Sequence, residues 1–125
     1  MARAPAAQPP EVTVDFSFED GLLFVSVANT SPRAATGVRV TFEPPLRGLG
    51  GTKAMNRLAL FRRLEFLAPH KEIRTLLDSS GAYFARGEPT KVTATVSFRD
   101  EAGGRHRRQI LHDLSIYRDI AYPLR

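Results

Sequence analysis

Alternating apolar and polar residues mark the first third of the chain. Between Glu11 and Phe18 the apolar side chains share one parity: Val12, Val14, Phe16 and Phe18. This period of two is typical of a strand that buries one face. The turn residues Glu19-Asp20-Gly21 follow, and then Leu22–Ala28 carries apolar side chains in register. The pattern predicts a β-hairpin.

Five further apolar or alternating runs predict strands, over Gly37–Phe42, Leu64–Leu67, Lys71–Leu77, Lys91–Phe98 and Gln109–Tyr117. Pro44-Pro45 removes two backbone donors and should end the third strand. Residues 100–104 should form a hairpin loop, and Thr52–Phe61 contains one weak helical turn that Thr52 could cap. Seven short strands predict an all-β fold, a two-sheet antiparallel immunoglobulin-like sandwich, with a barrel as the alternative.

Length and composition fit one soluble globular domain. The chain has 125 residues, of which 42% are hydrophobic and 25% charged. We expect a Pro/Ala-rich leader at 1–10, the sandwich at 11–120 and a short tail at 121–125. The leader has no hydrophobic stretch behind its one positive charge, so it does not fit a secretory signal. Such a linker also fits a domain cut from a longer, membrane-attached protein.

The chain contains no cysteine, which excludes disulfides and thiolate zinc sites and favours the cytoplasm. A Ser/His/Asp set drawn from Ser79 or Ser80, His112 and Asp113 lacks the spacing of a catalytic triad. His112 shares its parity with apolar neighbours, so we expect it to be partly buried and bonded to a backbone group. The sequence predicts no enzyme, no cofactor, no metal site and no small-molecule substrate.

Positive charge is in excess, with 18 Lys+Arg against 13 Asp+Glu and a net charge of +5. The densest basic run supplies a candidate patch for nucleic acid or an anionic membrane surface: Arg105, Arg107 and Arg108. Strand geometry places Arg105 and Arg107 on one face and Arg108 on the other. Aromatic residues for base stacking are missing from the neighbouring sequence. A solvated basic surface is the alternative interpretation.

The connection Pro44–Arg63 is long and apolar for a loop between sandwich strands. In an immunoglobulin-like topology it lies at the same end as Asp78–Thr90. Together they could form an apolar, arginine-rimmed contact for a protein partner. The candidate contact residues are Leu49, Met55, Leu58, Leu60, Phe61, Arg62, Tyr83, Phe84 and Arg86. The alternative is that these side chains cap the open end of the core.

Two stretches carry a family resemblance: Val25–Pro32, with its V-x-N strand end, and Val38–Leu46, with its V-x-V-x-F strand. With Phe66–Pro69 and Asp113–Arg118 they resemble bacterial immunoglobulin-like modules related to the cell-adhesion-related domain. Some uncharacterised modules of that type sit behind a membrane helix. The resemblance implies a non-enzymatic protein-interaction or structural accessory module. A basic-surface binder of nucleic acid or anionic lipid is the second hypothesis.

Overall fold

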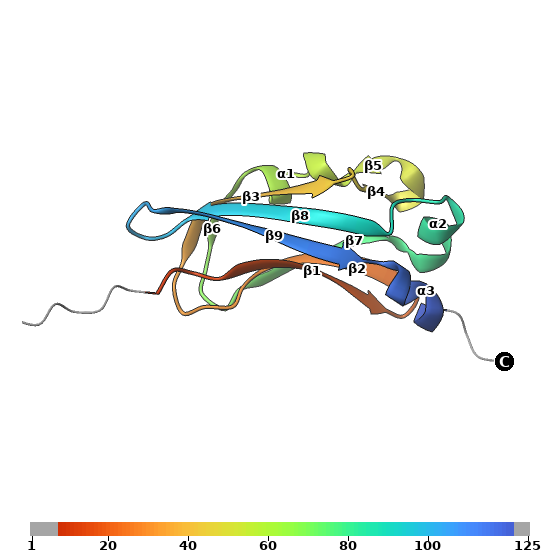
Figure 1. The fold of residues 1–125 in the computed structure, drawn as a ribbon, viewed down its shortest axis with the longest axis horizontal. Helices are drawn as coiled ribbons and strands as arrows, with labels where there is room; N and C mark the ends of the chain where they lie inside the picture. The colour runs from red at the N-terminus through yellow and green to blue at the C-terminus, as the bar shows by residue number, and fades with distance from the viewer. Residues whose placement is uncertain (1–7, 122–125) are drawn as a thin grey trace, which may run out of the picture.

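The computed structural model describes residues 8–121, so most of the expected leader and tail lies outside the described residues. Seven of the strands there form two antiparallel sheets, in the orders β1-β2-β7 and β6-β3-β8-β9 (Figure 1). The predicted all-β sandwich of two sheets is confirmed. The strands are β1 Val12–Glu19, β2 Leu22–Asn29, β3 Ala35–Glu43, β4 Arg47–Gly48, β5 Lys53–Ala54, β6 Leu64–Leu67, β7 Glu72–Ser79, β8 Lys91–Arg99 and β9 Arg105–Asp113.

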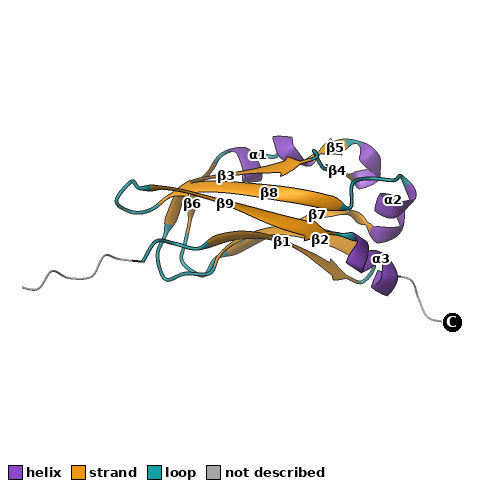
Figure 2. Cartoon of the chain, viewed as in Figure 1, coloured by secondary structure: helices purple, strands orange, loops and turns teal. Residues whose placement is uncertain are grey.

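The helical segments are short and gather mainly at one end, away from the β8–β9 hairpin (Figure 2). Two are 3-10 turns, η1 and η2, and three are α-helices: η1 Leu49–Gly51, η2 Met55–Arg57, α1 Ala59–Arg62, α2 Ser80–Ala85 and α3 Ser115–Ala121. Between residues 8 and 121 no helix has the length and apolarity needed to span a membrane.

The last strand differs from its prediction. It begins four residues earlier, at Arg105, because the Asp100 carboxylate accepts hydrogen bonds from the N–H groups of Ala102 and Gly104 and closes a tight hairpin. It ends at Asp113, whose carboxylate accepts bonds from the Ser115 N–H and hydroxyl and starts α3. The expected strand Gln109–Tyr117 is therefore wrong at both ends, since helix α3 takes its last residues.

The predicted helical turn over Thr52–Phe61 is not one helix, because β5, η2 and α1 share this segment in the structure. Gly50 and Gly51 have positive φ and turn the chain back, so that β4 and β5, each two residues long, pair as a short hairpin whose loop contains η1. Thr52 caps no helix start; its N–H instead donates to the Leu49 carbonyl at the end of η1. The apolar side chains of this connection then enter the core through η2 and α1.

The core lies between the two sheets and continues under α1. Side chains from the inner parities of β1, β2, β3 and β8 are buried, as the alternation predicts. The Phe61 ring of α1 packs edge-on against Phe42 of β3, with centroids 5.1 Å apart. Beside it, the Asn56 amide donates to the Phe42 carbonyl at 3.1 Å. These contacts cover the part of β3 that the short strand β6 does not reach.

The V-x-N motif, which ends at Asn29, has a structural role at the end of the sandwich where the β2–β3 loop lies. The Asn29 amide nitrogen donates to the carbonyls of Arg33, at 2.6 Å, and Leu67, at 3.2 Å. Its oxygen accepts bonds from the Ser31 N–H and hydroxyl. Because Asn29 is buried and these polar groups satisfy one another, the β2–β3 loop is fixed against β6.

The outer edge of β1 is closed by side chains from the other sheet and from α3. His112 Nε2 lies 2.9 Å from the Val14 carbonyl oxygen, and the Tyr117 hydroxyl donates to the Phe16 carbonyl at 2.8 Å. The expectation of a partly buried His112 with a backbone partner is confirmed. Two carbonyls of an edge strand thus have partners without a neighbouring strand.

Candidate functional site

The two long connections meet at one end of the sandwich, as expected. We call this the loop end, formed by β4, η1, α2 and α3 with the end of β7 (Figure 2). The Gly50 N–H donates to the Asp78 carboxylate at 2.9 Å, and the Arg86 guanidinium donates to the Arg47 carbonyl at 3.2 Å. Hydrogen bonds therefore join residues that lie almost 40 positions apart in the chain.

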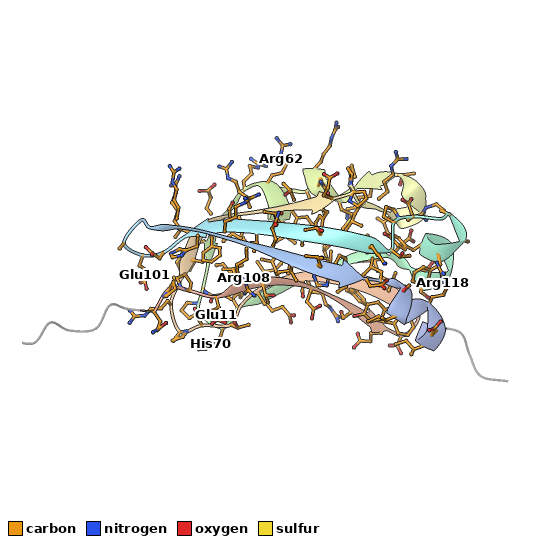
Figure 3. The ribbon with its side chains drawn as sticks, in the orientation of Figure 1. Glu11, Arg62, His70, Glu101, Arg108 and Arg118 are labelled. Carbon is orange, nitrogen blue, oxygen red and sulfur yellow. The ribbon has the colours of Figure 1, made fainter. Side chains whose placement is uncertain are left out.

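Three of the residues proposed for a partner contact are instead part of the core. Met55, Phe61 and Tyr83 have no exposed surface, because each fills the end of the space between the sheets. Of the remaining apolar candidates, Leu49 is exposed and three are partly buried: Leu58, Leu60 and Phe84. Arg62 points into solvent (Figure 3). The capping interpretation therefore describes most of this apolar set.

Arg86 bonds within the molecule. Its guanidinium donates to Asp78 at 2.7 Å and to Glu88 at 3.0 Å. Burial alone would raise the pKa of Asp78, but hydrogen bonds from the Gly50 N–H and from Arg86 outweigh it, so the pKa of this carboxyl is lowered. The Tyr83 hydroxyl nearby donates to the Pro89 carbonyl at 2.6 Å, and burial raises its pKa. Arg86 thus holds the loop end together.

A different cluster forms on the outer face of the four-stranded sheet. In the β8–β9 pairing Arg99 is opposite Arg105, and Ser97 is opposite Arg107. In the β3–β8 pairing Ser97 is also opposite Arg39. Residues directly opposite in a sheet share one face, and the inner face here is occupied by buried side chains such as Phe98. We call the set Arg39, Arg99, Arg105 and Arg107 the arginine face.

Arg99 and Arg105 are the pair next to the β8–β9 loop, so the arginine face lies at this hairpin end of the sheet. The hairpin tip carries Glu101, while Arg118 lies at the opposite end of the molecule (Figure 3). All four of its arginines are exposed. Within residues 8–121 none of the four guanidinium groups has a carboxylate oxygen within 4.0 Å. Arg99 and Arg105 are directly opposite on the sheet and their like charges repel, so this pair carries an electrostatic cost that no ion pair among the described residues relieves.

A shallow depression of about 410 Å³ lies among these side chains. Arg39, Arg99 and Arg105 line it together with Ser97, and Glu65 is the acidic residue in its lining. Guanidinium groups present several N–H donors in a planar fork that matches phosphate and carboxylate oxygens. The depression therefore offers donors from three neighbouring strands, β3, β8 and β9, to one anionic group.

The predicted basic patch is divided by the strand, as the sequence indicated. Arg105 and Arg107 belong to the arginine face, whereas Arg108 is opposite Val96, a core residue, and so leaves β9 on the other face. Sequence reasoning missed Arg39 and Arg99. The parity of Arg99 along its strand was visible in the sequence, but its neighbours across the sheet depend on the strand register.

A family model described as a domain of unknown function (DUF8453) matches residues 2–118. The chain belongs to the DUF8453 family. No curated protein and no solved structure shows significant similarity to it. Within this DUF8453 domain, the four charges of the arginine face have no carboxylate partner among residues 8–121, whereas the charges around Arg86 at the loop end are paired.

Proposed function

We propose that this DUF8453 domain is a non-enzymatic binding module that holds an anionic partner on its arginine face. One observation carries the proposal: four exposed guanidinium groups lie on adjoining positions of three strands and have no carboxylate partner among the described residues. A bound anion would remove the repulsion between them. It would also use the donors that the sheet already holds in place.

The spacing of the four charges supports a partner with several anionic groups. Neighbouring strands lie about 4.8 Å apart, and residues two apart along a strand about 6.6 Å. The four side chains therefore start about 5 to 12 Å from one another, a range that includes the Debye length of about 8 Å at physiological salt. At that distance their fields add, and a polyanion is attracted more strongly than a single charged group.

Retention on immobilised heparin tests the proposal. The wild-type domain should bind at low salt and elute as salt rises, because its cations displace the counterions of the polyanion. A variant with Arg39, Arg99, Arg105 and Arg107 all changed to Gln should elute in the flow-through.

The matched control also removes four positive charges, by changing exposed cations outside the arginine face to Gln: Arg33, Arg57, Arg62 and Lys71. It should be retained nearly as well as the wild type. Equal loss of retention in both variants would show that net charge alone governs binding, and the proposed site would be wrong.

A protein contact at the loop end is the second candidate function, favoured by a separate observation. Three of the large apolar side chains that stay exposed lie there: Leu49 on η1, and Ile116 and Ile120 on α3. Both elements contact α2. A photo-crosslinking residue in place of Leu49 should label one protein in cells, and changing Ile116 and Ile120 to Ser should abolish that label. A label that survives in the folded variant removes this candidate.

A further inference from the structure

Phe66 extends the arginine face into a row of four residues across four strands. On β6 it lies opposite Thr36, which lies opposite Arg99 on β8, which lies opposite Arg105 on β9. Its neighbour Leu67 is buried on the inner face, so Phe66 points outward, and 58% of its surface is exposed. The sequence near Arg105–Arg108 lacks an aromatic residue, and the fold supplies one from about 40 positions earlier.

We propose that the arginine face binds single-stranded nucleic acid, with Phe66 stacking on a base while the arginines contact the phosphate backbone. This inference rests on the proposed function and names its partner. An exposed aromatic ring beside a basic surface is the combination that single-strand binding uses: stacking is tolerant of sequence, and cations follow the backbone. Thr36 lies between Phe66 and Arg99, and Ser97 lies between Arg39 and Arg107, so their hydroxyls add hydrogen-bonding groups within the face.

The distribution of the other side chains on this sheet face argues against a membrane surface. The other large apolar residue that is exposed there is Leu111, opposite Thr93 at the far end of β9. Glu43 is also opposite Thr93, so it shares this row. A face lying flat on anionic lipid would bring this carboxylate against the headgroups. Phe66 and the four arginines instead lie close together, at the end of this sheet face next to the β8–β9 hairpin loop.

A double helix fits Phe66 poorly. In a duplex the faces of the bases are covered by their stacked neighbours, so a ring on a flat sheet reaches only the backbone. An unpaired strand exposes the base faces, and strand spacing places Phe66 about 10 Å from the start of the Arg99 side chain. Duplex DNA should therefore be bound through the arginines alone.

Replacing Phe66 measures the stacking contribution directly. We expect Phe66→Ala to weaken binding of a 12-nucleotide single strand about tenfold in fluorescence anisotropy at low salt, because the stacking of one base on the ring is lost. Its binding to a duplex of the same length should be nearly unchanged. Leu111→Ala is the matched control, since it also removes an exposed apolar side chain from this sheet face, and it should leave both affinities unchanged.

Phe66→Trp adds a spectroscopic readout. The chain contains no tryptophan, so the fluorescence of this variant reports on position 66 alone. The single strand should quench it, and the variant should bind at least as well as the wild type. Neither change should lower the melting temperature, because the ring lies largely in solvent.

The outcomes separate the inference from the proposed function. If heparin is retained through the arginines but Phe66→Ala binds the single strand as the wild type does, the nucleic-acid inference is overturned and the anion-binding proposal stands. Tighter binding to duplex or to phosphatidylserine vesicles than to the single strand also overturns the inference. If the wild type is not retained on heparin at all, both are overturned.

Discussion

Removing one charge from the arginine face should stabilise the domain. Arg99 and Arg105 are the last pair before the β8–β9 hairpin loop, and they face each other directly across the two strands. Arg99→Gln keeps a polar side chain on the exposed face and deletes one of the two charges. If the guanidinium groups repel one another as the geometry indicates, the variant should unfold less readily than the wild type.

The size of the effect follows from the separation of the charges. Two unit charges about 6 Å apart in water repel by about 0.7 kcal/mol. Salt at physiological strength, with a Debye length of about 8 Å, reduces this to about 0.3 kcal/mol. We therefore expect Arg99→Gln to raise the free energy of unfolding by about 0.3–0.7 kcal/mol at low salt. In 1 M salt the gain should vanish.

Urea unfolding at low salt and at 1 M NaCl checks this expectation. The control is Arg74→Gln, because Arg74 is also exposed but forms an ion pair with Glu19 at 3.4 Å and lies over the Phe24 ring at 4.0 Å. The control should lose stability or show no change. A destabilised Arg99→Gln, or a gain that high salt does not remove, would refute the claim that this charge is uncompensated.

Three further outcomes follow from the fold. Gly48→Ala should cost about 1–3 kcal/mol in urea unfolding, since a Cβ there meets the Leu77 carbonyl, whereas Gly81→Ala, in open space, should be neutral or stabilising; equal effects would contradict this packing. The lowered pKa of Asp78 means that its charged form stabilises the fold above its ordinary value of 3.8. The wild type should exceed Asp78→Asn in stability by the full margin above about pH 5, and this margin should shrink as the pH falls below 3.8. A margin that does not change with pH would refute the stabilising role of the Asp78 charge. Tyr117→Phe should lose about 1 kcal/mol by thermal or urea unfolding, because its hydroxyl bonds a β1 carbonyl, and no loss would show that water replaces it.

The strands were predictable because each buries one face, and burial leaves a period of two in the sequence. Six of the seven predicted strands lie where the alternation or apolar runs placed them, within two residues at each end. The last one was misjudged, since Leu114 and Ile116 continue the parity of Ile110 although the chain turns into a helix at Ser115. The alternation of apolar residues does not predict a helix start that depends on the hydrogen bond from the Ser115 N–H to the Asp113 carboxylate.

The candidate site was only half predictable. Arg105 and Arg107 stand together in the sequence, but Arg39 and Phe66 reach the same face through the pairings of β3 with β8 and β6. That register also depends on a shift between Thr36 and Arg39. The apolar loop residues were misjudged for another reason: composition alone does not distinguish a side chain that closes the core from one that contacts a partner.

The dependence of affinity on salt for a single-stranded oligonucleotide tests the arginine face most directly. If four arginines each neutralise one phosphate, the logarithm of the affinity should fall with the logarithm of the salt concentration with a slope of about −3. With Arg39, Arg99, Arg105 and Arg107 changed to Gln, the slope should be near zero. The same slope for both proteins would place the bound anion elsewhere and contradict the account.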